Sequence, residues 1–186
     1  MKELTSRERV LKNIRTALLH KSQASYANVD YETNVYTPIT DMPELYFAER
    51  FTEQGGKFVF CENSSEAKGA IDFLITDCNW KNIASSSILY TAATPPANEP
   101  IDVSVIDAEV LVARTGSVIV AANSLATLRV NNIIIIASTQ QLVNELGEAM
   151  LTYKDPQNLP DANHLSIITG SANADKEVYL ILIDNG

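Results

Sequence analysis

The stretch from Asp107 to Val120 constrains the fold of this chain more than any other. Two apolar runs rich in β-branched residues, Val110–Ala113 and Val118–Ala121, flank the short polar segment Arg114-Thr115-Gly116-Ser117. This spacing predicts two strands joined by a tight turn, and therefore a hairpin or an antiparallel excursion near one edge of a sheet. The turn offers backbone N–H groups and two hydroxyls, a pattern typical of places that hold an anion or a polar substrate.

Strands and helices alternate along the rest of the chain. Short runs of β-branched and aromatic residues predict further strands at Lys57–Cys61, Ile83–Ser85, Val103–Ile106, Ile133–Ala137, Leu165–Thr169 and Val178–Ile183. Helical patterns lie between several of these runs. The alternation predicts an α/β fold with a mostly parallel sheet flanked by helices.

Three helices are predicted in the domain, and two of them have clear start signals. Asp41 precedes Pro43 at the first, which the Gly55-Gly56 pair should end, and Asn63 with Glu66 fits a capping box at the second. We expect the third to begin at Thr139 and to carry an apolar face formed by Leu142, Val143, Leu146, Ala149 and Met150.

The sequence of the N-terminal region predicts a helical arm. Thr5 and Glu8 fit a capping box, and the next turns place apolar residues on one face, namely Val10, Leu11, Ile14 and Leu18. Polar sequence without periodicity then runs to Thr40. We therefore expect an arm with a linker over residues 1–40 and one α/β domain over residues 41–186. Docking of the arm on a neighbouring surface and packing on its own domain both remain open.

The composition and charge of the chain argue against several classes of function. The 186 residues carry a formal net charge of −9, which disfavours nucleic-acid binding, although six of the 14 basic side chains lie in the first 21 positions. The two cysteines are too few for an iron–sulfur cluster or a structural zinc site. We expect no secretory signal, because the first residues are too polar for one. The sequence also has no apolar run long enough to span a bilayer and no nucleotide-binding glycine motif. We expect a cytoplasmic protein without a cofactor or a bound metal.

Several polar residues are candidates for chemistry. Asp107 and Glu109 are two apart and should point to the same side of a strand, where paired carboxylates can divide acid and base roles. Ser85-Ser86-Ser87 follows a predicted strand, the place where open α/β sheets bind ligands. The loop Gly170–Glu177 also follows a strand, and its small residues would let the backbone approach a ligand closely. Solvated acids and ordinary polar connections are the alternatives.

Three segments of the chain resemble the LUD domain of the lactate-utilization protein C (LutC, also YkgG) family: Ala113–Ser117, the approach to the strand from Leu128 to Ile136, and the loop Gly170–Glu177. Arg7–Leu18 is similar to the opening helix of that family. The resemblance implies an α/β fold of the NagB/RpiA/CoA-transferase-like group. It also implies a part in the oxidation of L-lactate to pyruvate, alongside partner subunits that carry iron–sulfur clusters.

On this basis we expect an accessory or ligand-binding subunit of a lactate-utilization system that holds a small anionic ligand. The ligand-binding residues would be Thr115, Gly116, Ser117, Gly170, Ser171 and Asp175. An enzyme of the CoA-transferase or sugar-phosphate-isomerase type is an alternative, with Asp107, Glu109 or Glu177 as its catalytic acid–base groups. A non-catalytic interaction protein that docks through its N-terminal arm is another. The sequence leaves the formation of a homo-oligomer open.

Overall fold

The computed structural model describes residues 7, 10–12, 15–16, 38–39, 42–92, 99–121, 130–153, 165–170 and 176–184. The chain divides into two compact units, Met1–Thr37 and Pro38–Gly186. In the first unit the described residues are helical, and the Thr16 hydroxyl donates to the Lys12 carbonyl oxygen at 2.9 Å. Thr5 and Glu8, which form the predicted capping box, lie outside the described residues.

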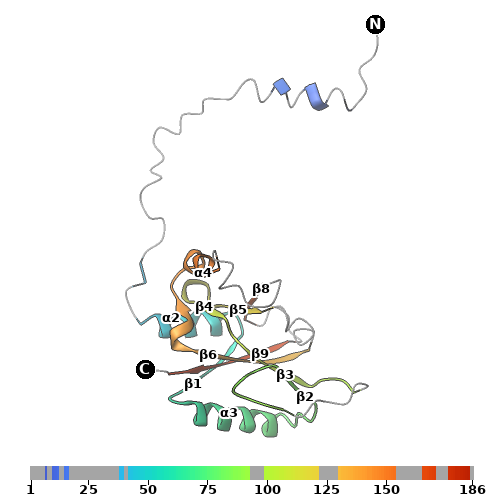
Figure 1. Cartoon of the computed structure of the whole chain (residues 1–186), viewed down its shortest axis with the longest axis vertical. Helices are drawn as coiled ribbons and strands as arrows, with labels where there is room; N and C mark the ends of the chain where they lie inside the picture. Colours follow the sequence, from blue (N-terminus) through green and yellow to red (C-terminus); the bar gives the residue numbers. More distant parts are fainter. Residues whose placement is uncertain are drawn as a thin grey trace. The chain divides into compact units, whose positions relative to one another are not determined.

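The second unit is built on a five-stranded parallel sheet with the order β1-β9-β6-β3-β2 (Figure 1). Its strands are β1 (Lys57–Cys61), β2 (Ile83–Ser85), β3 (Val103–Asp107), β6 (Asn132–Ser138) and β9 (Glu177–Ile183). All five begin within one residue of the sequence-based prediction. The α/β fold class, with a mostly parallel sheet flanked by helices, is therefore confirmed.

A second, smaller sheet has the order β7-β4-β5-β8. It consists of β4 (Val110–Val112), β5 (Ser117–Ala121), β7 (Leu142–Val143) and β8 (Leu165–Thr169). β5 pairs antiparallel with both β4 and β8, whereas β7 pairs parallel with β4. The predicted hairpin around Thr115 is confirmed, with the short 3₁₀ helix η1 (Ala113–Thr115) in its connection.

The elements form layers because the side chains of each sheet alternate between two apolar cores, one of which the two sheets share. α3 (Ser64–Asp77) covers one face of the parallel sheet, and the second sheet lies beyond the other face (Figure 1). α2 (Pro43–Glu53) contributes Phe47 and Phe51 to the core that both sheets share. α4 (Leu146–Thr152) packs Ala149 on the far face of the second sheet. Successive residues of β9, for example Leu180 and Ile181, therefore face different cores.

The helix ends follow the local sequence signals. The Asn63 side chain accepts hydrogen bonds from the amides of Ser65 and Glu66, so the predicted N-cap of α3 is confirmed. α2 starts with Pro43 at its first turn and ends before Gly55, whose φ is +84°. Asp41, the predicted N-cap of α2, lies outside the described residues.

The prediction of one continuous helix from Thr139 is wrong. Thr139–Gln141 forms the 3₁₀ helix η4, Leu142–Val143 forms strand β7, and α4 begins only at Leu146. Leu142 and Val143 pair with Leu111 and Val112 of β4, so strand pairing overrides the helical spacing of the apolar residues. Within the described residues no helix is long and apolar enough to cross a membrane.

Candidate functional site

A pocket of about 650 Å³ opens at the carboxyl ends of β3, β6 and β9. This is the edge at which open parallel sheets usually bind ligands. Its polar lining comes from Ser86, Asp107, Glu109, Ser138 and Gln141. Apolar side chains, among them those of Ile88, Leu89, Ile136 and Ile183, complete the wall. We call this cavity the sheet-edge pocket.

Asp107 is held in place by the segment that follows β2. One carboxylate oxygen accepts a hydrogen bond from the Ser87 hydroxyl, and the other accepts one from the Ile88 amide at 2.8 Å. The Ser87 oxygen in turn accepts a hydrogen bond from the Leu89 amide at 3.1 Å. Asp107 therefore stands at the end of β3 as an oriented acceptor rather than a mobile surface acid.

Glu109 lies beyond the end of β3, so it does not share a strand with Asp107 as the sequence had predicted. Both side chains nevertheless line the sheet-edge pocket. Burial raises the pKa of the Glu109 carboxyl, and the negative charge of Asp107 raises it further. The Glu109 backbone is fixed by its amide, which donates to the Ile119 carbonyl oxygen at 2.8 Å. The pocket thus contains one firmly held carboxylate and a second carboxyl that retains its proton more readily than usual.

Gln141 connects two walls of the pocket. Its side-chain nitrogen donates to the Ala108 carbonyl oxygen at 2.6 Å, and its side-chain oxygen accepts from the Ser138 amide at 2.7 Å. Gln141 therefore fixes the segment that carries Asp107 and Glu109 against the end of β6. Sequence reasoning missed this residue because it placed Gln141 in the first turn of a long helix.

The turn Arg114–Ser117 packs against the end of α2. The Gln54 side-chain nitrogen donates to the Thr115 carbonyl oxygen at 2.6 Å. Gly116 has a φ of +58°, and a Cβ atom there would lie 2.5 Å from the Phe51 backbone nitrogen. Arg114 pairs with Glu145 at 2.5 Å between Nε and Oε1. These contacts give the turn a role in packing, whereas ligand binding by Thr115, Gly116 and Ser117 stays a prediction.

The segment after β8 lies beside this turn. Ser117 pairs with Thr169 across the two strands, and their hydroxyl oxygens are 3.3 Å apart. Gly170 has a φ of +55°, and a Cβ atom at this position would overlap the Gln54 carbonyl oxygen and lie 2.7 Å from the Gln54 Cβ. Gly170 and Lys176 also line a small cavity of about 200 Å³.

The other two predicted ligand-binding residues follow Gly170 in the sequence. Ser171 and Asp175 fall outside the described residues, so their assignment stays a prediction.

Glu177 is the first residue of β9, so it lies at the amino ends of the parallel strands, opposite to the sheet-edge pocket. It pairs with Lys57 at 3.0 Å and accepts a hydrogen bond from the Tyr179 hydroxyl at 2.6 Å. The Tyr179 hydroxyl lowers the pKa of Glu177, and Lys57 lowers it further. The structure therefore brings Asp107 and Glu109 together and places Glu177 apart from them. Among the described residues, no group of three or more His, Cys, Asp or Glu side chains could hold a metal ion.

Comparisons with known proteins bear on the fold. No protein-family model and no curated protein match the sequence. Among solved structures, the chain is similar to a DUF162-family protein from Deinococcus radiodurans, with 16% sequence identity and a TM-score of 0.59. The match covers 76% of this chain and 96% of that chain. DUF162 is the LUD domain family. At this identity the likeness shows that this chain has a fold similar to that of a LUD-domain protein.

Proposed function

We propose that this chain binds a small hydroxycarboxylate in the sheet-edge pocket and acts as an accessory subunit of an L-lactate oxidation system. The observation that carries the binding site is the pairing of a held carboxylate, Asp107, with a carboxyl of raised pKa, Glu109, in one pocket. The lactate connection is supported by the sequence resemblance to the LutC family and by the LUD-like fold.

The charges of the pocket define how such a ligand would bind. Two ionised carboxylates would repel an anion, so a ligand carboxylate is favoured when Glu109 holds a proton and donates it in a hydrogen bond. Asp107 already accepts two hydrogen bonds from the protein and has lone pairs left for a ligand hydroxyl. Binding of the carboxylate is therefore coupled to uptake of a proton at Glu109.

Calorimetric titration with L-lactate tests this coupling. We expect the affinity to rise as the pH falls from 8 to 6, because protonated Glu109 donates to the ligand. Glu109→Gln keeps a neutral donor of the same shape and should bind with little dependence on pH. Glu49→Gln, which changes an exposed glutamate on α2, should behave like the unmodified protein. An affinity for L-lactate that is insensitive to pH in the unmodified protein would overturn the proposed mode of binding.

The connection with lactate oxidation is tested separately. Purification of the chain from its own cells under native conditions should recover subunits that carry iron–sulfur clusters. Recovery of the chain alone, from cells that are growing on L-lactate, would contradict the proposed role as an accessory subunit.

A second function is favoured by the size of the pocket. Even at about 30 Å³ for each non-hydrogen atom, the volume of a water molecule in the liquid, the six such atoms of lactate would fill less than a third of the 650 Å³ cavity. A larger substrate and an acid–base role for Glu109 and Asp107 would suit an enzyme of the CoA-transferase type. Glu109→Gln distinguishes the two functions, because it should preserve binding of a carboxylate but abolish turnover of an acyl-CoA.

A further inference from the structure

An apolar groove lies on the side of the second unit where α2 meets β1. Met42, Leu45 and Ala48 line it from the start of α2, and Phe58 and Phe60 line it from β1. Its volume is about 420 Å³. We call this feature the α2–β1 groove. It shares no lining residue with the sheet-edge pocket, although Thr139 and Asp184 of the groove directly follow Ser138 and Ile183 of that pocket.

The apolar side chains of the groove are open to solvent. Met42 is 72% exposed, Leu45 is 58% exposed and Phe60 is 49% exposed. β1 is also the terminal strand of the parallel sheet, so its outer edge has no partner among the described strands. Large apolar side chains gathered beside a sheet edge are typical of an interaction surface.

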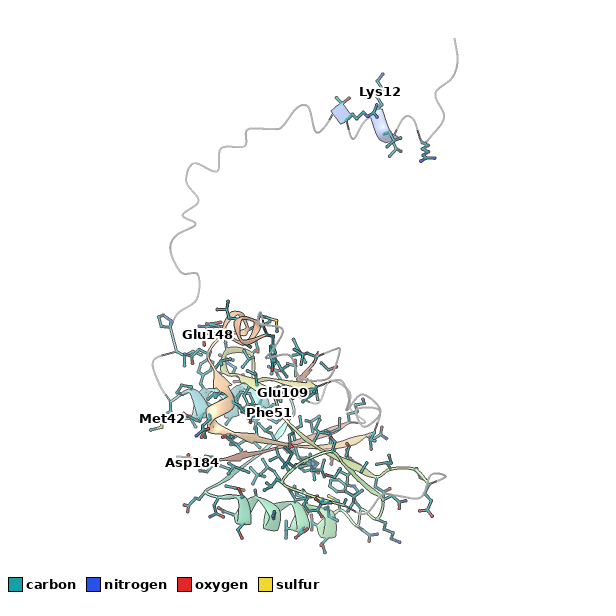
Figure 2. All side chains as sticks on the ribbon, viewed as in Figure 1. Lys12, Met42, Phe51, Glu109, Glu148 and Asp184 are labelled. Carbon is teal, nitrogen blue, oxygen red and sulfur yellow. The ribbon has the colours of Figure 1, made fainter. Side chains whose placement is uncertain are left out.

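Thr139 and two acidic residues, Glu44 and Asp184, complete the lining of the groove. Glu44 lies in the first turn of α2, and Asp184 follows the last residue of β9. Figure 2 shows Met42 and Asp184 on the same side of the unit. The groove therefore combines an apolar floor with negative charge, which suits a segment that is both apolar and basic.

The N-terminal segment of this chain has that chemistry. Its first 21 residues contain six basic and two acidic side chains, whereas the other 165 contain eight basic and 21 acidic ones. In the described helical residues, Val10 and Leu11 are exposed apolar side chains. Arg15 lies four positions after Leu11, on the same side of the helix, and Lys12 supplies further positive charge.

We propose that the α2–β1 groove binds the N-terminal helix of a second copy of this chain, and that the exchange is reciprocal. Val10 and Leu11 enter the apolar floor, while Arg15, on the same side of the helix as Leu11, faces Glu44 and Asp184, and Lys12 adds to the positive charge of the helix. Each copy presents both an exposed groove and an exposed apolar helix, so one two-fold arrangement covers both pairs of surfaces. The product is a closed dimer held by two identical contacts.

Sedimentation equilibrium of the full-length protein tests the apolar part of the proposal. We expect a dimer whose dissociation constant increases at least about tenfold in Leu45→Ser and in Leu11→Ser. Phe73→Ser changes an exposed apolar residue of α3, on the other side of the parallel sheet, and should leave the dimer unchanged. A monomeric unmodified protein, or a dimer that tolerates both groove and helix substitutions, would overturn the proposal.

Charge reversal tests whether the helix comes from a second copy. Copies with Glu44→Lys and Asp184→Lys should dimerise weakly on their own, as should copies with Lys12→Glu and Arg15→Glu. An equal mixture should form a strong heterodimer, because each groove then meets a helix of opposite charge. All four residues lie at the surface or near it, so the substitutions should leave the cores intact. A mixture that dimerises no better than its components would show that the helix does not bind a second copy and would overturn the proposal.

Discussion

Gly116 should stabilise the fold because its turn packs so closely against the end of α2 that a Cβ atom has no room there. Gly116→Ala tests this directly. At a φ of +58°, an alanine pays about 1–2 kcal/mol for the left-handed backbone conformation. Its Cβ would also lie 2.5 Å from the Phe51 nitrogen and 2.7 Å from the Arg50 carbonyl carbon, and relief of such crowding typically costs about 1–3 kcal/mol. We therefore expect Gly116→Ala to lower the free energy of unfolding by about 2–5 kcal/mol.

The end of α2 cannot easily move away from the added methyl group. Phe51 is fully buried, and its ring stacks on that of Phe47 with a centroid distance of 5.7 Å. Displacement of the α2 backbone at Phe51 would therefore disturb the core that the two sheets share. The crowding must be met largely by the turn itself, which is also held by the hydrogen bond from Gln54 to Thr115.

Gly69→Ala is the matched control. Gly69 lies within α3, and a Cβ atom there would meet no other atom within 4 Å. The same chemical change should therefore raise the free energy of unfolding by about 0.5–1 kcal/mol, because alanine loses less backbone entropy in a helix.

Urea unfolding followed by circular dichroism measures both variants. The expected result is a lower midpoint for Gly116→Ala and a higher midpoint for Gly69→Ala, with the slope unchanged in each. A midpoint for Gly116→Ala equal to that of the unmodified protein would refute the reasoning that the turn is fixed against α2.

Three further predictions concern the polar groups. Gln141→Ala leaves the Ser138 amide and the Ala108 carbonyl without their partner, so it should lower the free energy of unfolding by about 1–3 kcal/mol; an unchanged urea midpoint would contradict the bridging role. Folding raises the pKa of Glu109 above its ordinary value of 4.5, so the folded state disfavours the charged carboxylate. As the pH rises above 4.5, the free energy of unfolding of Glu109→Gln should therefore increase relative to that of the unmodified protein. A relative decrease over the same pH range would contradict the burial of this carboxyl. The pKa of Glu177 is lowered instead, so the unmodified protein should be more stable than Glu177→Gln at neutral pH, and the difference should vanish as acid protonates the carboxyl. Thermal melts that show no difference between the two proteins from pH 2 to pH 7 would contradict the contacts of Glu177 with Lys57 and Tyr179.

The strands of the fold were predictable from the sequence because their cause is local. Runs such as Ile133–Ala137 and Val178–Ile183 are continuous and apolar, as strands buried on both faces require. The Asn63 cap and the hairpin turn at Gly116 also follow from the conformational preferences of one or two residues. These signals act over a few residues, so they can be recognised without the rest of the chain.

The second sheet and the arrangement of the pocket depend on contacts between distant segments. Leu142 and Val143 carry a helical pattern, but they pair with β4, which precedes them by some 30 positions. Ser87 and Asp107 are 20 residues apart, and their hydrogen bond exists only because β2 and β3 are neighbours in the sheet. Sequence reasoning could name Ser87 and Asp107 as separate candidates, yet only the structure joins them.

The packing of the Thr115–Ser117 turn could not be predicted from the sequence either, because it too depends on contacts with a distant segment. Its glycine and hydroxyls suggest a ligand-binding turn, and nothing nearby in the sequence shows that Gln54, 61 residues earlier, contacts it. The residues that hold the turn lie at the end of α2, so a glycine required for close packing resembles a glycine required for ligand binding.

The most direct test of the proposed site is a titration of the ¹⁵N-labelled protein with L-lactate, followed by two-dimensional NMR. The proposal predicts chemical-shift changes centred on the amides that surround the sheet-edge pocket, namely those of Ile88, Ala108, Glu109, Ser138 and Gln141. Shift changes centred instead on Thr115, Gly116, Ser117 and Gly170, or the absence of any change at saturating L-lactate, would contradict it.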